Sequence, residues 1–184
     1  KVTLRSVRST IAISKSFRFS STSEMFCFQC EQTRDGTGCA TTAPGSAETG
    51  VCGKTPETAT LQDLTMSALK TAGWYGHRLN KMGSSTPVIE KLREPMFATL
   101  TNVNFDPSRF VKYLGELEGV TAELAKEYNS LGGKEQIPAE YAPLKVKGKS
   151  VEELETEGRR HGVLARKSAF GNDDLLGLYE LLSY

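Results

Sequence analysis

Hydrophobic side chains recur at steps of three and four residues along most of the chain beyond residue 55. This period is typical of amphipathic helices that bury one face. A first helix is predicted over 56–80, with Thr55 as its N-cap and Pro56 at its first helical position. Its apolar face is formed by Leu61, Leu64, Ala68, Ala72 and Tyr75.

Two further helices follow the same rules. One is predicted from Pro87 to about Asn104 with a bend at Pro95, because proline cannot donate to the helical hydrogen bonds. The next begins at Asp106–Pro107 and ends at Gly132–Gly133. Its apolar face comprises Phe110, Val111, Leu114, Leu117, Val120, Leu124 and Tyr128.

Residues 132–149 are rich in Gly, Pro and Lys and predict a long surface connection. Ser150 and Glu153 then form a capping box for a helix of about 151–168, and another helix starts at 173 after a Gly-Asn pair. No segment shows the period-two alternation of a strand. The pattern predicts an all-α fold, an antiparallel helical bundle with an irregular cysteine loop at its N-terminal end.

Charge separates the first 24 residues from the rest of the chain. Residues 1–24 hold seven serines and five basic residues, and their only acid is Glu24. This composition is typical of an organelle transit peptide, and we expect a mitochondrial address. The alternatives are a plastid or other organelle, and a disordered tail with no address. The domain proper is then 25–184. The chain does not begin with Met and stops within an apolar helical pattern, so we expect further domains beyond it.

The remainder of the chain is mildly acidic, with no basic stripe suited to phosphates, so nucleic-acid binding is not expected. No apolar run approaches the roughly 20 residues of a membrane span. The two histidines, His77 and His161, fall in different predicted helices and are expected to be surface or interhelical polar residues. Trp74 and Tyr75 are expected to pack in the core or against a loop.

The four cysteines are the main candidates for chemistry. Cys27, Cys30, Cys39 and Cys52 have the spacing C-x2-C-x8-C-x12-C, with no histidine among them and several glycines between them. Four thiolates in one flexible segment suit a structural zinc site or an iron–sulfur cluster. A disulfide pair is disfavoured in a reducing compartment, and zinc ribbons usually carry two C-x2-C knuckles where this chain has one.

The words around these cysteines are more specific than their spacing. MFCFQCEQT at 25–33, GVCGKT at 50–55, LQDL at 61–64 and TLTNVNFD at 99–106 resemble the N-terminal region of the hybrid cluster proteins. These are also called prismane proteins or hydroxylamine reductases. LLGLYELLSY at 175–184 is similar to a later helix of the same family.

The resemblance implies that Cys27, Cys30, Cys39 and Cys52 ligate a cubane [4Fe–4S] cluster, or a [2Fe–2S] cluster as in one subgroup. The gap before Cys39 is similar to the cubane-bearing subgroup, while the twelve-residue gap after it is longer than either pattern. Members of the family reduce hydroxylamine to ammonia, or take nitric oxide as the substrate instead. A redox partner protein supplies the electrons.

The family's hybrid Fe–S–O cluster is held by a His, two Glu and several Cys of later domains. No cysteine lies beyond Cys52, so we expect that site to be outside this chain, which then has no catalytic residue of its own. Two other hypotheses remain. In the first, the chain is a stand-alone iron–sulfur electron carrier. In the second, it is a zinc-stabilised helical interaction module.

Overall fold

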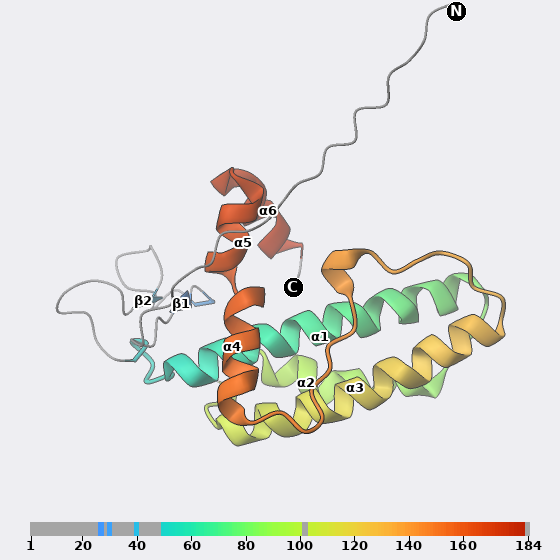
Figure 1. The fold of residues 1–184 in the computed structure, drawn as a ribbon, viewed down its shortest axis with the longest axis horizontal. Helices are drawn as coiled ribbons and strands as arrows, with labels where there is room; N and C mark the ends of the chain where they lie inside the picture. Colours follow the sequence, from blue (N-terminus) through green and yellow to red (C-terminus); the bar gives the residue numbers. More distant parts are fainter. Residues whose placement is uncertain (1–25, 28, 31–38, 41–48, 101–102, 183–184) are drawn as a thin grey trace, which may run out of the picture.

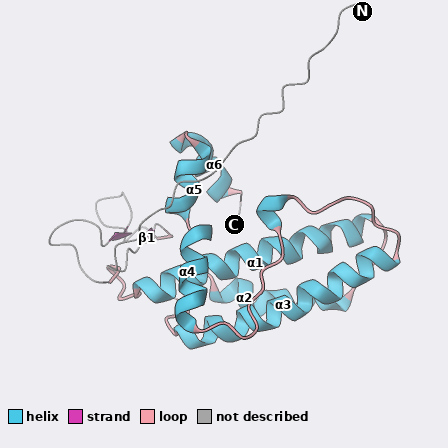
Figure 2. Ribbon diagram, viewed as in Figure 1, coloured by secondary structure: helices cyan, strands magenta, loops and turns pink. Residues whose placement is uncertain are grey.

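The computed structural model describes residues 26–27, 29–30, 39–40, 49–100 and 103–182. Helices dominate this part of the chain (Figures 1 and 2), which confirms the all-α prediction. Two strands of two residues each precede the helices in the sequence and pair with each other. The elements are β1 (Phe26–Cys27), β2 (Cys39–Ala40), α1 (Pro56–Lys81), the 3-10 helix η2 (Pro87–Leu92), α2 (Arg93–Ala98), α3 (Pro107–Ser130), the 3-10 helix η3 (Ala139–Tyr141), α4 (Val151–His161), α5 (Val163–Phe170) and α6 (Asp173–Leu181).

The predicted starts of the long helices are confirmed. Thr55 Oγ1 accepts a hydrogen bond from the Thr58 amide at 3.2 Å, and Pro56 opens α1. Asp106 caps α3 in the same way, through the Ser108 amide at 2.9 Å. Each cap satisfies an amide that has no partner within its own helix. α1 and α3 therefore begin where the sequence places them.

The single helix expected from Pro87 to Asn104 is wrong. The chain forms η2 and then α2, which ends at Ala98. Pro95 lies in the first turn of α2, where an amide has no intrahelical partner to lose. The proline is thus accommodated at the start of a new helix and does not bend an existing one.

The two longest helices, α1 and α3, run parallel to each other (Figure 1). Thr58 Oγ1 donates to the Phe105 carbonyl at 3.3 Å near their N-terminal ends. Ser84 Oγ, just beyond α1, lies 2.6 Å from Glu127 Oε1 near the C-terminal end of α3. The antiparallel arrangement expected for the bundle is therefore not confirmed for this pair, because η2 and α2 together provide the return path between them.

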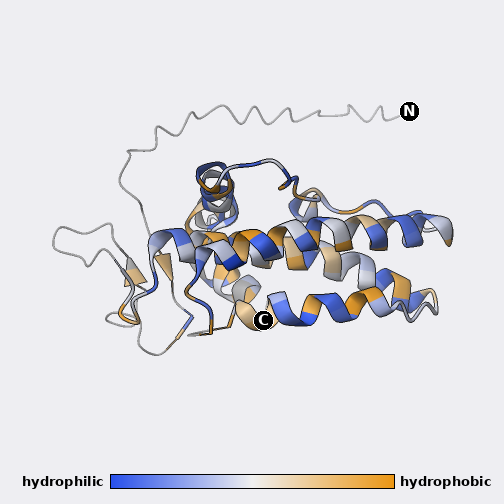
Figure 3. Ribbon diagram, turned by 90° about the horizontal axis from the view of Figure 1, so that it is seen from below, coloured by the Kyte–Doolittle hydropathy of each residue, from blue (hydrophilic) through white to orange (hydrophobic). Residues whose placement is uncertain are grey.

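The core lies between α1 and α3. Both helices carry alternating hydrophobic and hydrophilic positions (Figure 3), and the apolar ones meet. Burying a single Leu or Phe side chain contributes about 1.5–3 kcal/mol. Trp74 is buried as expected, and its ring meets those of Tyr75 and Tyr128 edge-on at 5.0 and 5.6 Å. The fully buried side chains of this core include Leu61, Leu64, Leu79, Phe110, Leu114, Leu117 and Leu124.

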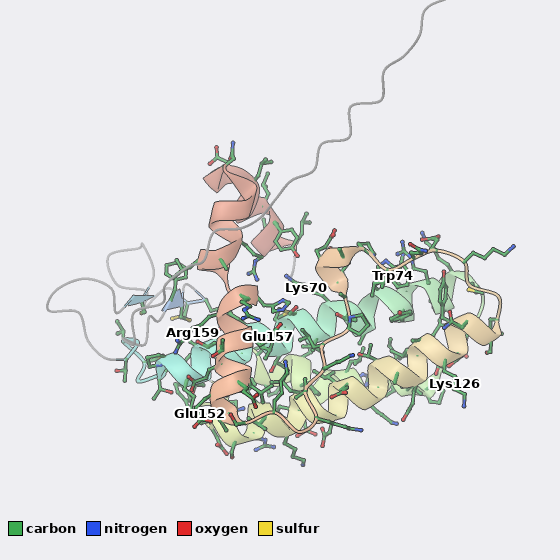
Figure 4. The ribbon with its side chains drawn as sticks, in the orientation of Figure 1. Lys70, Trp74, Lys126, Glu152, Glu157 and Arg159 are labelled. Carbon is green, nitrogen blue, oxygen red and sulfur yellow. The ribbon has the colours of Figure 1, made fainter. Side chains whose placement is uncertain are left out.

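α4 crosses α1 near its N-terminal half, with Glu157 and Arg159 beside the crossing (Figure 4). The predicted capping box is confirmed: the Glu153 amide donates to Ser150 Oγ, and Glu153 Oε2 accepts from the Ser150 amide. The helix expected to reach about residue 168 is interrupted at Gly162, which has an extended backbone (φ −68°, ψ 163°). The predicted break after it is confirmed at Gly171. Within the described residues, no helix has the length and apolarity needed to cross a membrane.

Candidate iron–sulfur site

Two of the four cysteines face each other across the short sheet. β1 and β2 are antiparallel, and their register pairs Cys27 with Cys39. Cys39 is buried, Cys27 is half-buried, and both pack with Ala59 in the first turn of α1. The sheet therefore places this pair of thiols against the N-terminal end of the longest helix.

A tight turn carries the last cysteine. The Gly50 amide donates to the Lys54 carbonyl at 2.8 Å, and the Gly53 amide donates to the Gly50 carbonyl at 2.9 Å. Gly53 has a φ of +90°, a conformation that side-chain-bearing residues rarely adopt. Cys52 lies inside this turn and is half-buried. The turn leads directly into Thr55 and α1, so Cys52 is also held at the N-terminal end of that helix.

The environment of Cys27 sets the charge state of its thiol in the metal-free chain. Burial raises the pKa of Cys27 above its ordinary value. A backbone hydrogen bond from Gln29 and the positive charge of Lys54 oppose this rise, while Asp63 and Cys39 add to it. The neutral thiol is therefore favoured until a cation binds, since a bound metal deprotonates a coordinating thiol.

The chemical type of the potential ligands suits an iron–sulfur cluster. Cys27, Cys30, Cys39 and Cys52 are all free thiols, and soft thiolates select iron–sulfur clusters or zinc. In geometry, the described residues bring Cys27 and Cys39 together, and no group of three or more potential ligands gathers among them. The four-cysteine ligand set therefore remains a prediction. Residues 31–38 and 41–48, which connect the cysteines, lie outside the described residues.

Neither histidine belongs to the cysteine region. His77 is exposed on α1. His161 Nδ1 lies 3.0 Å from Ser67 Oγ, which joins α4 to α1, and its Nε2 lies 3.4 Å from Glu157 Oε1. The expectation that each histidine is a surface or interhelical polar residue is confirmed.

Comparison with known proteins gives these cysteines a context. Residues 25–182 match the Prismane/CO dehydrogenase family. The chain belongs to this family. The matched range includes all four cysteines and every helix from α1 to α6. The resemblance carried by the cysteine motifs is thereby confirmed.

Curated relatives of this prismane-family chain are named hydroxylamine reductase. That of Parabacteroides distasonis is 37% identical over 161 residues, which cover 87% of this chain and 27% of the relative. That of Rhodospirillum rubrum is 33% identical over 168 residues, covering 87% and 28%. That of Thermotoga maritima is 38% identical over 132 residues, covering 70% and 29%. The chain thus spans little more than a quarter of the length of these relatives.

Sequence reasoning missed one part of the site, a polar cluster beneath the cysteine segments. It consists of Lys54, Gln62 and Gln29, and the first two are almost fully buried at 2% exposure each. Lys54 and Gln62 belong to the motifs GVCGKT and LQDL that carry the family resemblance, but their residue types did not predict a contact between them. A lysine beside a flexible glycine turn is usually solvent-exposed, so its burial emerges only from the fold.

Proposed function

We propose that this chain is the N-terminal iron–sulfur electron-transfer domain of a hydroxylamine reductase. The observation that carries the proposal is the family match over 25–182, which includes four free cysteines, two of them side by side at the start of α1. The names of the relatives support the activity of the whole protein.

The proposed ligands are Cys27, Cys30, Cys39 and Cys52. The cluster is [4Fe–4S], with [2Fe–2S] as the alternative because of the long gap between Cys39 and Cys52. Once bound, such a cluster takes up and releases single electrons. The chain's own residues hold it and limit its contact with water: Cys39 is buried, and the N-terminal turn of α1 covers one side of the pair that it forms with Cys27.

Reduction of hydroxylamine to ammonia requires two electrons and protons delivered to a bound nitrogen. That chemistry needs an open metal position and nearby acids, and four cysteines around one cluster leave no such position. We therefore propose that the hybrid Fe–S–O cluster and its substrate, hydroxylamine or nitric oxide, belong to parts of the protein outside these 184 residues. A redox partner protein supplies the electrons.

The address of the protein is a separate proposal. Residues 1–24, which lie outside the described residues, are proposed to direct it to the mitochondrion, with a plastid as the alternative. Fusing these residues to a fluorescent protein tests the proposal. Mitochondrial fluorescence is expected, and diffuse fluorescence would contradict any organelle address.

Metal and sulfide analysis tests the proposed cluster. The full 184-residue chain, reconstituted anaerobically with iron and sulfide, should hold about four of each per chain. Serine in place of any one of Cys27, Cys30, Cys39 and Cys52 should lower both contents severely. Val51→Ser is a matched control, because Val51 neighbours Cys52 in the same turn and is 54% exposed. Stoichiometric zinc without sulfide would contradict the proposal in favour of a structural zinc module.

A further inference from the structure

Lys54 is a buried cation with an unusual set of partners. Its side chain is 2% exposed, and Nζ donates to Gln62 Oε1 at 2.6 Å and to Gln29 Oε1 at 3.4 Å. No carboxylate of the described residues forms an ion pair with it. Burying a charged ammonium is costly unless a negative charge compensates it, so a negative group beside Lys54 would stabilise it.

The partners of Lys54 come from the segments that carry the cysteines. Gln29 lies between Cys27 and Cys30 in the sequence, and its Oε1 also accepts a hydrogen bond from Gln62 Nε2. The backbone carbonyl of Lys54 closes the turn that contains Cys52. Gln62 anchors the group to α1 and donates to the Thr99 carbonyl. The contacts of Lys54 therefore join the C-x2-C segment, the Cys52 turn and the N-terminal half of α1.

The contacts of Lys54 place its charge beside the segments that carry the cysteines: Nζ donates to Gln29, which lies between Cys27 and Cys30, and Lys54 follows the Cys52 turn directly. An iron–sulfur cluster with four thiolate ligands is negatively charged, and reduction adds one more negative charge. A nearby cation in a low-dielectric environment stabilises the reduced state more than the oxidised state.

We propose that Lys54 is a positioning residue whose buried positive charge raises the reduction potential of the cluster held by the four cysteines. This inference rests on the proposed function. Gln29 and Gln62 hold the ammonium in place, so that the charge is fixed relative to the C-x2-C segment and to the Cys52 turn. A negatively charged cluster in this place would in turn stabilise the buried ammonium.

Four variants of the full chain test the proposal by spectroelectrochemical measurement of the cluster potential. Lys54→Met removes the charge. Gln29→Glu keeps an oxygen that accepts from both Lys54 and Gln62 but adds a negative charge beside the ammonium. Lys54→Arg retains the positive charge. Lys126→Met removes an exposed charge on α3 and is the matched control (Figure 4).

Lys54→Met and Gln29→Glu should each lower the potential. At the wild-type midpoint, the ratio of reduced to oxidised cluster should fall about tenfold, which is 59 mV for one electron. Lys54→Arg and Lys126→Met should stay near the wild type. Unchanged or raised potentials in the first two variants would overturn the proposal. So would loss of the cluster in both Lys54→Arg and Gln29→Glu, because the network would then be only structural. If the wild-type chain itself assembles no iron and sulfide, the proposed function fails as well.

Discussion

The crossing of α4 over α1 depends on one glycine. Gly158 is buried in α4, and a Cβ at this position would lie 2.6 Å from the Thr60 carbonyl oxygen and 2.7 Å from Thr60 Cγ2. Carbon atoms in good contact are about 3.5–4.0 Å apart. Since the Thr60 carbonyl belongs to the backbone of α1, it cannot move aside as a flexible side chain would. Gly158→Ala must therefore push the two helices apart.

Two opposing effects decide the magnitude. Alanine is favoured over glycine in a helix interior by about 1 kcal/mol, whereas forcing an extra group into a well-packed contact costs about 1–3 kcal/mol. Gly73→Ala in α1 isolates the second effect, because Gly73 is exposed and its added Cβ would meet nothing within 4 Å. Gly158→Ala should be less stable than Gly73→Ala by about 1–3 kcal/mol.

Urea unfolding of the two variants, followed by far-ultraviolet circular dichroism, measures this difference. The wild-type chain should lie between them or close to the Gly158 variant, since Gly73→Ala is expected to stabilise α1. Equal free energies of unfolding for the two variants would refute the reasoning, because they would show that α4 does not approach Thr60 as closely as described.

Three further predictions concern the connection after α3, the cysteine loop and the activity of the chain. The Glu118 carboxylate accepts hydrogen bonds from the backbone N–H groups of Val146 and Lys147 at 2.9 and 2.8 Å. Partial burial acts to raise the pKa of Glu118, but these hydrogen bonds lower it overall. The stability that Glu118 adds to the fold is therefore present above its unfolded pKa of about 4.3 and is lost as the pH falls through the lower folded pKa. Glu118→Gln should therefore cost about 1 kcal/mol at pH 7 and much less at pH 3, and an equal cost in urea unfolding at both pH values would contradict this. Deleting residues 43–48, which contain no cysteine, should leave the iron and sulfide content unchanged, whereas a loss equal to that of the Cys→Ser variants would show that the loop shapes the site. The purified chain with its cluster should produce no ammonia from hydroxylamine with a reduced viologen as donor, and robust production would reveal a substrate site within these residues.

The sequence predicted local structure correctly where one or two adjacent residues determine it. Thr55 and Pro56 fixed the start of α1, and Ser150 with Glu153 fixed the start of α4, because capping depends on a few adjacent residues. The apolar period of α3 likewise identified its buried face, with only Val111 left half-exposed. These features need no knowledge of the rest of the fold.

Features that depend on distant residues were not readable. The parallel course of α1 and α3 follows from the return path through η2 and α2, and the sequence alone did not distinguish those two short helices from one long one. The interruption at Gly162 had a visible signal, the glycine itself, but glycine also occurs within helices, as Gly158 does. The burial of Lys54 had none, because its amide partners lie 25 and 8 residues away in the chain.

Reversible reduction of the reconstituted chain tests the central claim most directly. Under anaerobic conditions, a potentiometric titration of the full 184-residue protein, followed by visible absorbance and electron paramagnetic resonance, counts the electrons that its metal centre accepts. We predict one electron per chain, returned fully on reoxidation, and no such signal when Cys39 is replaced by serine. A chain that binds stoichiometric metal but takes up no electron would contradict an electron-transfer domain.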